Sequence, residues 1–148
     1  MKKLNKLFCF IEEKKQHEEE KARLKGEKAR KENQIKEITV LKSVAMNGMP
    51  NGSSASSPVE RYNIRLEQLK EELQCICEKI LTEIERIDES IKNIEKCLKN
   101  IEDAEVRVIA RKRFIENKDY QTIGDEMYID RTTAYKKLKR YFERMEEV

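Results

Sequence analysis

Residues 58–101 read PVERYNIRLEQLKEELQCICEKILTEIERIDESIKNIEKCLKNI. Apolar side chains recur along this stretch at alternating steps of four and three residues, with one extra step of four after Ile80. They are Tyr62, Leu66, Leu69, Leu73, Ile76, Ile80, Ile84, Ile87, Ile91, Ile94, Leu98 and Ile101. Such a sustained seven-residue repeat predicts a coiled-coil helix over residues 57–103, and the extra step only unwinds the supercoil locally.

The segment that precedes this helix, residues 1–46, is itself predicted to be one long charged helix. It holds thirteen basic and eight acidic residues, whereas residues 57–103 hold eight basic and twelve acidic ones. Residues 47–56 concentrate Gly, Pro, Ser and Asn and therefore form a linker. A helix-start signal of cap, first-position proline and acidic third residue follows it: Ser57, Pro58 and Glu60.

The opposite net charges of the two long helices predict an antiparallel hairpin that closes at the linker. Because basic and acidic residues interleave along residues 1–46, a solvated helix is favoured over a nucleic-acid-binding tail. In this hairpin the charged middle of the first helix would leave four apolar side chains uncovered: Leu73, Ile76, Ile80 and Ile84. We therefore expect a homodimer through the helical arm, with hairpin against extended dimer left open.

The composition predicts an all-α protein and argues against several other classes. About half of the residues are Ala, Glu, Lys, Leu or Arg, a share typical of long helices. Only 38% of the residues are hydrophobic and 41% are charged, which argues against a large core and a deep enzymatic pocket. The first apolar run, residues 7–11, is too short for a secretory signal, and no later stretch reaches membrane-spanning length. We expect a cytoplasmic protein that does not associate with membranes.

The sequence also lacks the residue patterns of metal sites and of common enzymes. Its four cysteines and single histidine do not have the spacing of zinc ligands: Cys9, Cys75, Cys77, Cys97 and His17. Neither a glycine-rich phosphate loop nor a nucleophile with an adjacent histidine base is present. We therefore expect no catalytic residues, no metal and no cofactor.

The last segment, residues 104–148, changes to a pattern of short helices. A first helix is marked by Val106, Ile109, Ala110 and Phe114, and it is followed by a break at residues 117–119. Residues 120–127 and 131–145 form two further helices, joined by a turn of three residues. Three helices with such a turn are the layout of a helix-turn-helix.

Residues 123–135, IGDEMYIDRTTAY, resemble the helix-turn-helix of sigma-factor region 4, and within that group phage transcriptional regulators of the RinA/ArpU type. The upstream residues 107–115, RVIARKRFI, fit that family's pattern of an apolar pair followed by Arg and an aromatic residue. The resemblance implies roles in the turn and on the inner helix face for Gly124, Ile129, Asp130, Ala134 and Leu138. Gly124 is then the residue at the helix crossing, Ile129 the apolar plug and Asp130 the cap. The sequence departs from the pattern at Gly124, where Ala is usual, and at Tyr128, where many helix-turn-helix proteins have Gly.

The predicted last helix carries six basic residues and one acidic residue between Arg131 and Arg144. If Ala134 and Leu138 face inward, the outward side chains can contact a DNA duplex. The candidate DNA-binding residues are Arg131, Thr132, Thr133, Tyr135, Lys136, Lys137, Lys139 and Arg140. The first turn would contact base edges, with Arg131 bidentate to guanine, and the later basic residues would contact phosphates.

These features predict a sequence-specific DNA-binding transcriptional regulator that acts on double-stranded DNA, and the resemblance implies that it is encoded by a phage or prophage. The target sequence, the direction of regulation and contact with host RNA polymerase stay open. One alternative is a DNA-packaging protein similar to small terminase subunits, which would assemble as a ring. Another is a coiled-coil interaction protein without DNA binding, favoured by acidic residues near the basic helix: Asp125, Glu126, Asp130 and Glu143.

Overall fold

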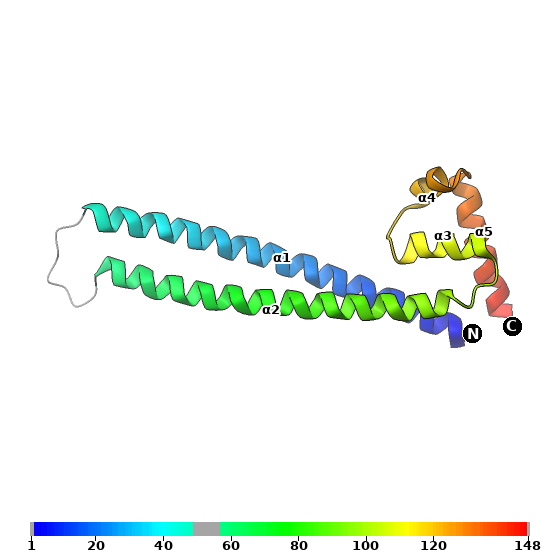
Figure 1. The fold of residues 1–148 in the computed structure, drawn as a ribbon, viewed down its shortest axis with the longest axis horizontal. Helices are drawn as coiled ribbons and strands as arrows, with labels where there is room; N and C mark the ends of the chain where they lie inside the picture. The colour runs from blue at the N-terminus through cyan, green and yellow to red at the C-terminus, as the bar shows by residue number, and fades with distance from the viewer. Residues whose placement is uncertain (1, 49–56, 148) are drawn as a thin grey trace. The chain divides into compact units, whose positions relative to one another are not determined.

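The computed structural model describes residues 2–48 and 57–147, and every regular element in these ranges is a helix. The helices are α1 (Lys2–Gly48), α2 (Pro58–Leu98), α3 (Ala104–Phe114), α4 (Tyr120–Met127) and α5 (Arg131–Glu147), as Figure 1 shows. The all-α class is therefore confirmed. The predicted linker, residues 47–56, lies outside the described residues from position 49 onward, and its first two residues end α1.

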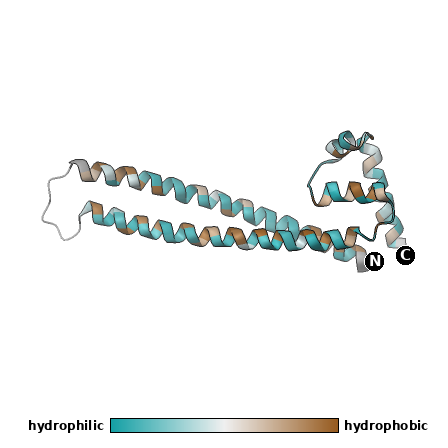
Figure 2. Cartoon of the chain, in the orientation of Figure 1, coloured by the Kyte–Doolittle hydropathy of each residue, from teal (hydrophilic) through white to brown (hydrophobic). Residues whose placement is uncertain are grey.

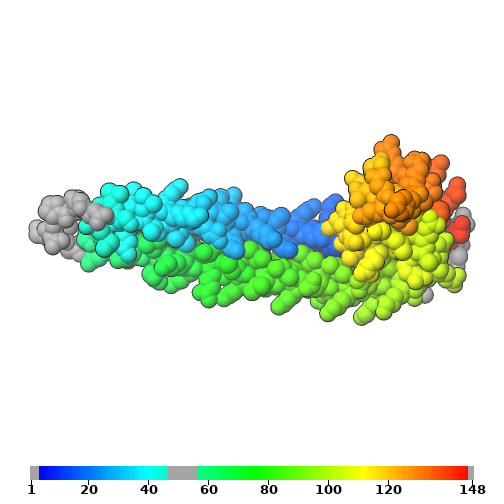
Figure 3. All heavy atoms as spheres, turned by 45° about the horizontal axis from the view of Figure 1, so that its top comes forward, coloured from blue at the N-terminus to red at the C-terminus, as the bar shows by residue number. Residues whose placement is uncertain are grey.

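The chain divides into two compact units, which we describe separately. Unit 1 comprises Met1–His17 and Glu85–Val148, and unit 2 comprises Glu18–Ile84. In unit 2, Lys31 Nζ donates a hydrogen bond to Glu72 Oε2 at 2.7 Å, while Leu24 packs with Ile76 and Ile80. Because later residues of α1 meet earlier residues of α2, the two helices run antiparallel in this unit, and Figure 3 shows their side chains meeting closely.

The apolar seam of α2 in unit 2 is better covered than its charged partner helix suggested. Ile76 and Ile80 are only 7% and 8% exposed, and Leu24 of α1 is 2% exposed. The expectation that these two isoleucines lie uncovered is wrong, although Leu73 and Ile84 are partly exposed. Leu24 packs directly against both isoleucines, and the aliphatic stems of long charged side chains can also cover apolar surface. Figure 2 shows how hydrophilic the middle of α1 nevertheless is.

Burial along α2 keeps a strict seven-residue spacing across the point where the sequence has its extra step. Leu69, Ile76, Glu83 and Ser90 follow each other at this spacing and are all buried. Ile84 and Ile91, which lie one position beyond Glu83 and Ser90, are not buried but partly exposed. After the extra step Ile87, Ile94 and Leu98 of the apolar pattern are buried. The expectation that the extra step disturbs the coiled coil only locally therefore holds at these positions, and it fails at Ile84 and Ile91, which are partly exposed. At positions 83 and 90 the helix is buried although the apolar repeat has shifted by one residue, so the polar residues Glu83 and Ser90 are buried there.

Two of the three short helices of unit 1, α3 and α4, begin after an aspartate whose side chain caps them. Asp103 accepts hydrogen bonds from the main-chain N–H of Glu105 at 2.9 Å and of Val106 at 3.3 Å, which caps α3. Asp119 caps α4 by accepting from Thr122 N at 2.8 Å. In unit 2 the expected start of α2 is confirmed in the same way, because Glu60 N donates to Ser57 Oγ at 3.1 Å.

The core of unit 1 joins α3, α4 and α5 to the neighbouring ends of α1 and α2. Its buried residues are Leu7, Ile94, Leu98, Ile101, Val106, Ile109, Ala110, Ile123, Ala134 and Leu138. Lys14 of α1 is also buried, at 2% exposure, and its Nζ donates to Asn117 Oδ1 at 2.8 Å. The turn between α3 and α4 is thus fastened to α1 within this unit. In the described part of the chain, no helix combines the length and the apolar character needed to cross a membrane.

Candidate nucleic-acid interface

The turn between α4 and α5 brings these two helices into very close contact at Gly124. The residue is buried, and a Cβ added to it would lie 2.6 Å from Ile129 O and 3.1 Å from Arg131 N. The main-chain N–H of Ile129 donates to Gly124 O at 2.9 Å, which closes the turn. The close main-chain approach explains why Gly stands here instead of the usual Ala.

Tyr128 ends α4 in the left-handed conformation, with φ 57° and ψ 40°. Glycine adopts this conformation without the steric cost that a side chain incurs, so the departure at this position carries strain. Ile129, the next residue, packs against the core of unit 1, as the resemblance implied for the apolar plug. Asp130 precedes α5, and its carbonyl accepts the first helical hydrogen bond, from Ala134 N at 3.1 Å.

We expect Tyr128→Gly to stabilise unit 1 by about 1 kcal/mol, because it removes the left-handed strain at an exposed position. The Tyr128 side chain is 95% exposed, so almost no packing is lost with it. Urea unfolding followed by circular dichroism measures the change. Tyr128→Ala is the matched control, since it removes the ring but keeps a Cβ, and it should leave stability nearly unchanged. Equal stability of the Gly and Ala variants would contradict the strain.

Helix α5 turns its apolar side inward and its basic side outward, as the sequence predicted. Ala134 and Leu138 are 0% and 2% exposed. The exposed candidate residues are Arg131, Thr132, Thr133, Tyr135, Lys136, Lys139 and Arg140. We call this set the α5 outer face. These side chains are exposed and lie together on one helix that starts directly after the turn.

Lys137 is the one candidate residue that the structure places differently. It is partly buried, and its Nζ donates to Glu105 Oε2 of α3 at 2.6 Å. This pair joins α5 to the first turn of α3. The positive charge of Lys137 is thus directed toward the carboxylate of Glu105 rather than toward the α5 outer face.

Two residues that the sequence reasoning missed support the α5 outer face from α3 and α4. The rings of Tyr120 and Tyr135 meet edge to face with 5.3 Å between centroids. The Arg113 guanidinium lies 4.8 Å from the centre of the Tyr120 ring, and Lys139 Nζ lies 5.8 Å from that of Tyr135. Cations at such distances from an aromatic ring are attracted to it. These contacts hold Tyr135 in place. The sequence does not predict them, because Arg113, Tyr120 and Tyr135 come together only in the folded structure.

The acidic residue Glu126 of α4 is held by two lysines. Lys112 Nζ and Lys118 Nζ each donate to its carboxylate at 2.7 Å. These hydrogen bonds, that from Lys112 first, lower the pKa of Glu126, and the bond to Glu126 raises the pKa of Lys118. The carboxylate is therefore compensated locally, so it opposes an approaching polyanion less than a free one would. Its bonds also tie α4 to the end of α3 and the turn after it.

Comparison of the chain with protein-family models, curated proteins and solved structures finds no match. Among the described residues, no group of three or more His, Cys, Asp or Glu side chains is arranged to hold a metal ion.

Proposed function

We propose that this protein binds double-stranded DNA in a sequence-specific manner through the α5 outer face and thereby regulates transcription. The observation that carries the proposal is the exposure of this basic face on a helix that follows a tight turn. Ala134 and Leu138 occupy the opposite side of the same helix and are buried. This is the arrangement that lets a helix enter a major groove while the two preceding helices support it.

The residue types on the α5 outer face divide the work of binding. Arg131, in the first helical turn, has the planar fork that pairs with the O6 and N7 acceptors of guanine. Thr132 and Tyr135 can contact a neighbouring base or a thymine methyl group. Lys136, Lys139 and Arg140 neutralise phosphates, so the affinity they contribute falls as salt rises. Specificity and affinity then come from different residues of one helix.

Transcriptional regulation and a phage or prophage origin rest on the resemblance to regulators of the RinA/ArpU type, whereas the homodimer rests on the apolar surface of the helical arm. Exposed apolar side chains in unit 2 support a protein partner there, because such groups often mark interaction surfaces. They include Val40, Val44, Met46 and Ile64, each at least 60% exposed. A second copy of the chain is the partner we propose, and host RNA polymerase is a further candidate for this surface.

The proposed function is tested by selecting bound sequences from random duplex DNA with the full chain at low salt. We expect one enriched motif that is arranged as two half-sites, because a dimer presents two copies of α5. The mass of the selected complex, measured by sedimentation, should correspond to two chains per duplex. Retention of no duplex at low salt would contradict the proposal and favour an interaction protein. A closed ring of chains on the duplex would favour a packaging role instead.

A further inference from the structure

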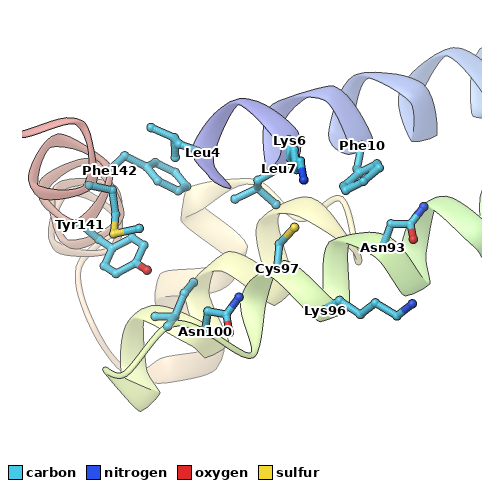
Figure 4. A pocket seen from close by; sticks show the side chains of 12 residues that line it. Leu4, Lys6, Leu7, Phe10, Asn93, Lys96, Cys97, Asn100, Tyr141 and Phe142 are labelled. Atoms are coloured by element: carbon cyan, nitrogen blue, oxygen red, sulfur yellow. The ribbon is translucent and has the colours of Figure 1, made fainter. Parts of the chain in front are cut away.

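Unit 1 contains an apolar pocket of about 310 Å³ that is separate from the α5 outer face. Figure 4 shows that its lining comes from the start of α1, the last turns of α2 and the end of α5. Leu7 and Phe10 of α1 contribute apolar side chains, as do Phe142 and Met145 of α5. The volume is near the lower end of the range of about 300–1,000 Å³ that is typical of small-molecule sites.

The polar residues around this pocket favour a negatively charged ligand. Among the residues whose side chains the structure describes, the charged ones that line the pocket are Lys6 and Lys96, which are both exposed, and no carboxylate lines it. Asn93 and Asn100 add neutral donors and acceptors.

Two further groups define the electrostatics of the pocket. Burial raises the pKa of the Cys97 thiol, while the nearby Lys6 ammonium acts in the opposite direction. Burial also raises the pKa of Tyr141, followed by the negative charge of Glu102. Both side chains line the pocket and stay protonated at neutral pH, so each can donate a hydrogen bond. Lys6 is thus close enough to the lining for its charge to be felt inside.

We propose that this pocket binds a small organic anion with an apolar body, such as a medium-chain carboxylate. The apolar body lies against Leu7, Phe10 and Phe142, where it is removed from water. The carboxylate lies at the mouth near Lys6 of α1. Lys96 of α2, which also lines a neighbouring pocket with Glu85, Asp88 and Glu89, adds a second positive charge. A ligand held in this way bridges α1, α2 and α5, and it stabilises unit 1 by binding only the folded state. The inference does not depend on DNA binding.

Isothermal titration calorimetry of the full chain with sodium decanoate tests the proposal. The decanoate concentration is kept below the value at which decanoate forms micelles. We expect saturable binding of one decanoate per chain, and about tenfold weaker binding of decanol, which has the same tail without the charge. The double variant Lys6→Gln/Lys96→Gln should lose about this tenfold preference while keeping its affinity for decanol. Lys15→Gln is the matched control, because Lys15 is an exposed residue of α1 that does not line the pocket.

Several results would overturn the proposal. One is the absence of saturable decanoate binding. Another is a loss of decanoate affinity in the Lys15→Gln control that equals the loss in the Lys6→Gln/Lys96→Gln variant. A stoichiometry of one decanoate per two chains would show that a second copy of the protein covers the pocket. If the chain sedimented with phosphatidylglycerol vesicles but did not bind monomeric decanoate, the pocket would be a membrane-binding surface. All the substitutions are at exposed positions, so circular dichroism of the variants should match that of the unchanged chain.

Discussion

Replacing Gly124 by Ala is expected to destabilise unit 1 by about 2 kcal/mol or more, because the added methyl group collides with the main chain. The new Cβ would lie 2.6 Å from Ile129 O, a distance that real Cβ atoms essentially never show. The carbonyl cannot move aside alone, since Ile129 N is held to Gly124 O at 2.9 Å. Alanine gains about 1 kcal/mol in helix propensity over glycine, and we expect the collision to exceed this gain.

The same substitution at Gly26 is the matched control, and its expected effect has the opposite sign. Gly26 also lies within a helix, but an added Cβ would meet nothing within 4 Å. Only the propensity gain then remains, so Gly26→Ala should stabilise the chain by about 0.5–1 kcal/mol. Urea unfolding of both variants measures the two changes. A stabilised Gly124→Ala protein would show that α4 and α5 do not pack as closely as described.

Local sequence signals predicted the bounds and the buried side of a helix well at positions where one or two residues determine them. The expected range of α4, residues 120–127, agrees with the structure, and so does the start of α2 at Pro58. The orientation of α5 followed from Ala134 and Leu138, because two small or apolar residues one helical turn apart define a buried side. Caps were predicted less completely, since Asp103 was not recognised although its side chain caps α3.

Other features depend on contacts between residues far apart in the chain, which spacing alone does not reveal. The burial of Glu83 in place of Ile84 results from which face of α2 its partner covers. The pair between Lys137 and Glu105 is similar, since nothing in the basic run of α5 distinguishes this lysine from its neighbours. The apolar pocket also went unpredicted, because it is assembled from three separate segments of the sequence.

Replacing Arg131 by Ala is expected to reduce the preference for the selected DNA site over a scrambled duplex by about tenfold to a hundredfold. The Arg131 side chain is exposed in the first turn of α5, which is the part of such a helix that reaches base edges. A bidentate contact to guanine exists only at the correct base pair, so its loss weakens the specific complex most. Dissociation constants for both duplexes, measured at one salt concentration, give the preference before and after the change.

Arg140→Ala is the matched control, because Arg140 is an exposed arginine of the same helix, more than two turns from Arg131. A phosphate contact is indifferent to sequence, so this variant should weaken binding to both duplexes alike. The slope of log affinity against log salt should also become shallower, by about one unit. If Arg131→Ala behaved in the same way, weakening all duplexes equally, Arg131 would be a phosphate contact. The reading of bases would then have to lie elsewhere on the α5 outer face.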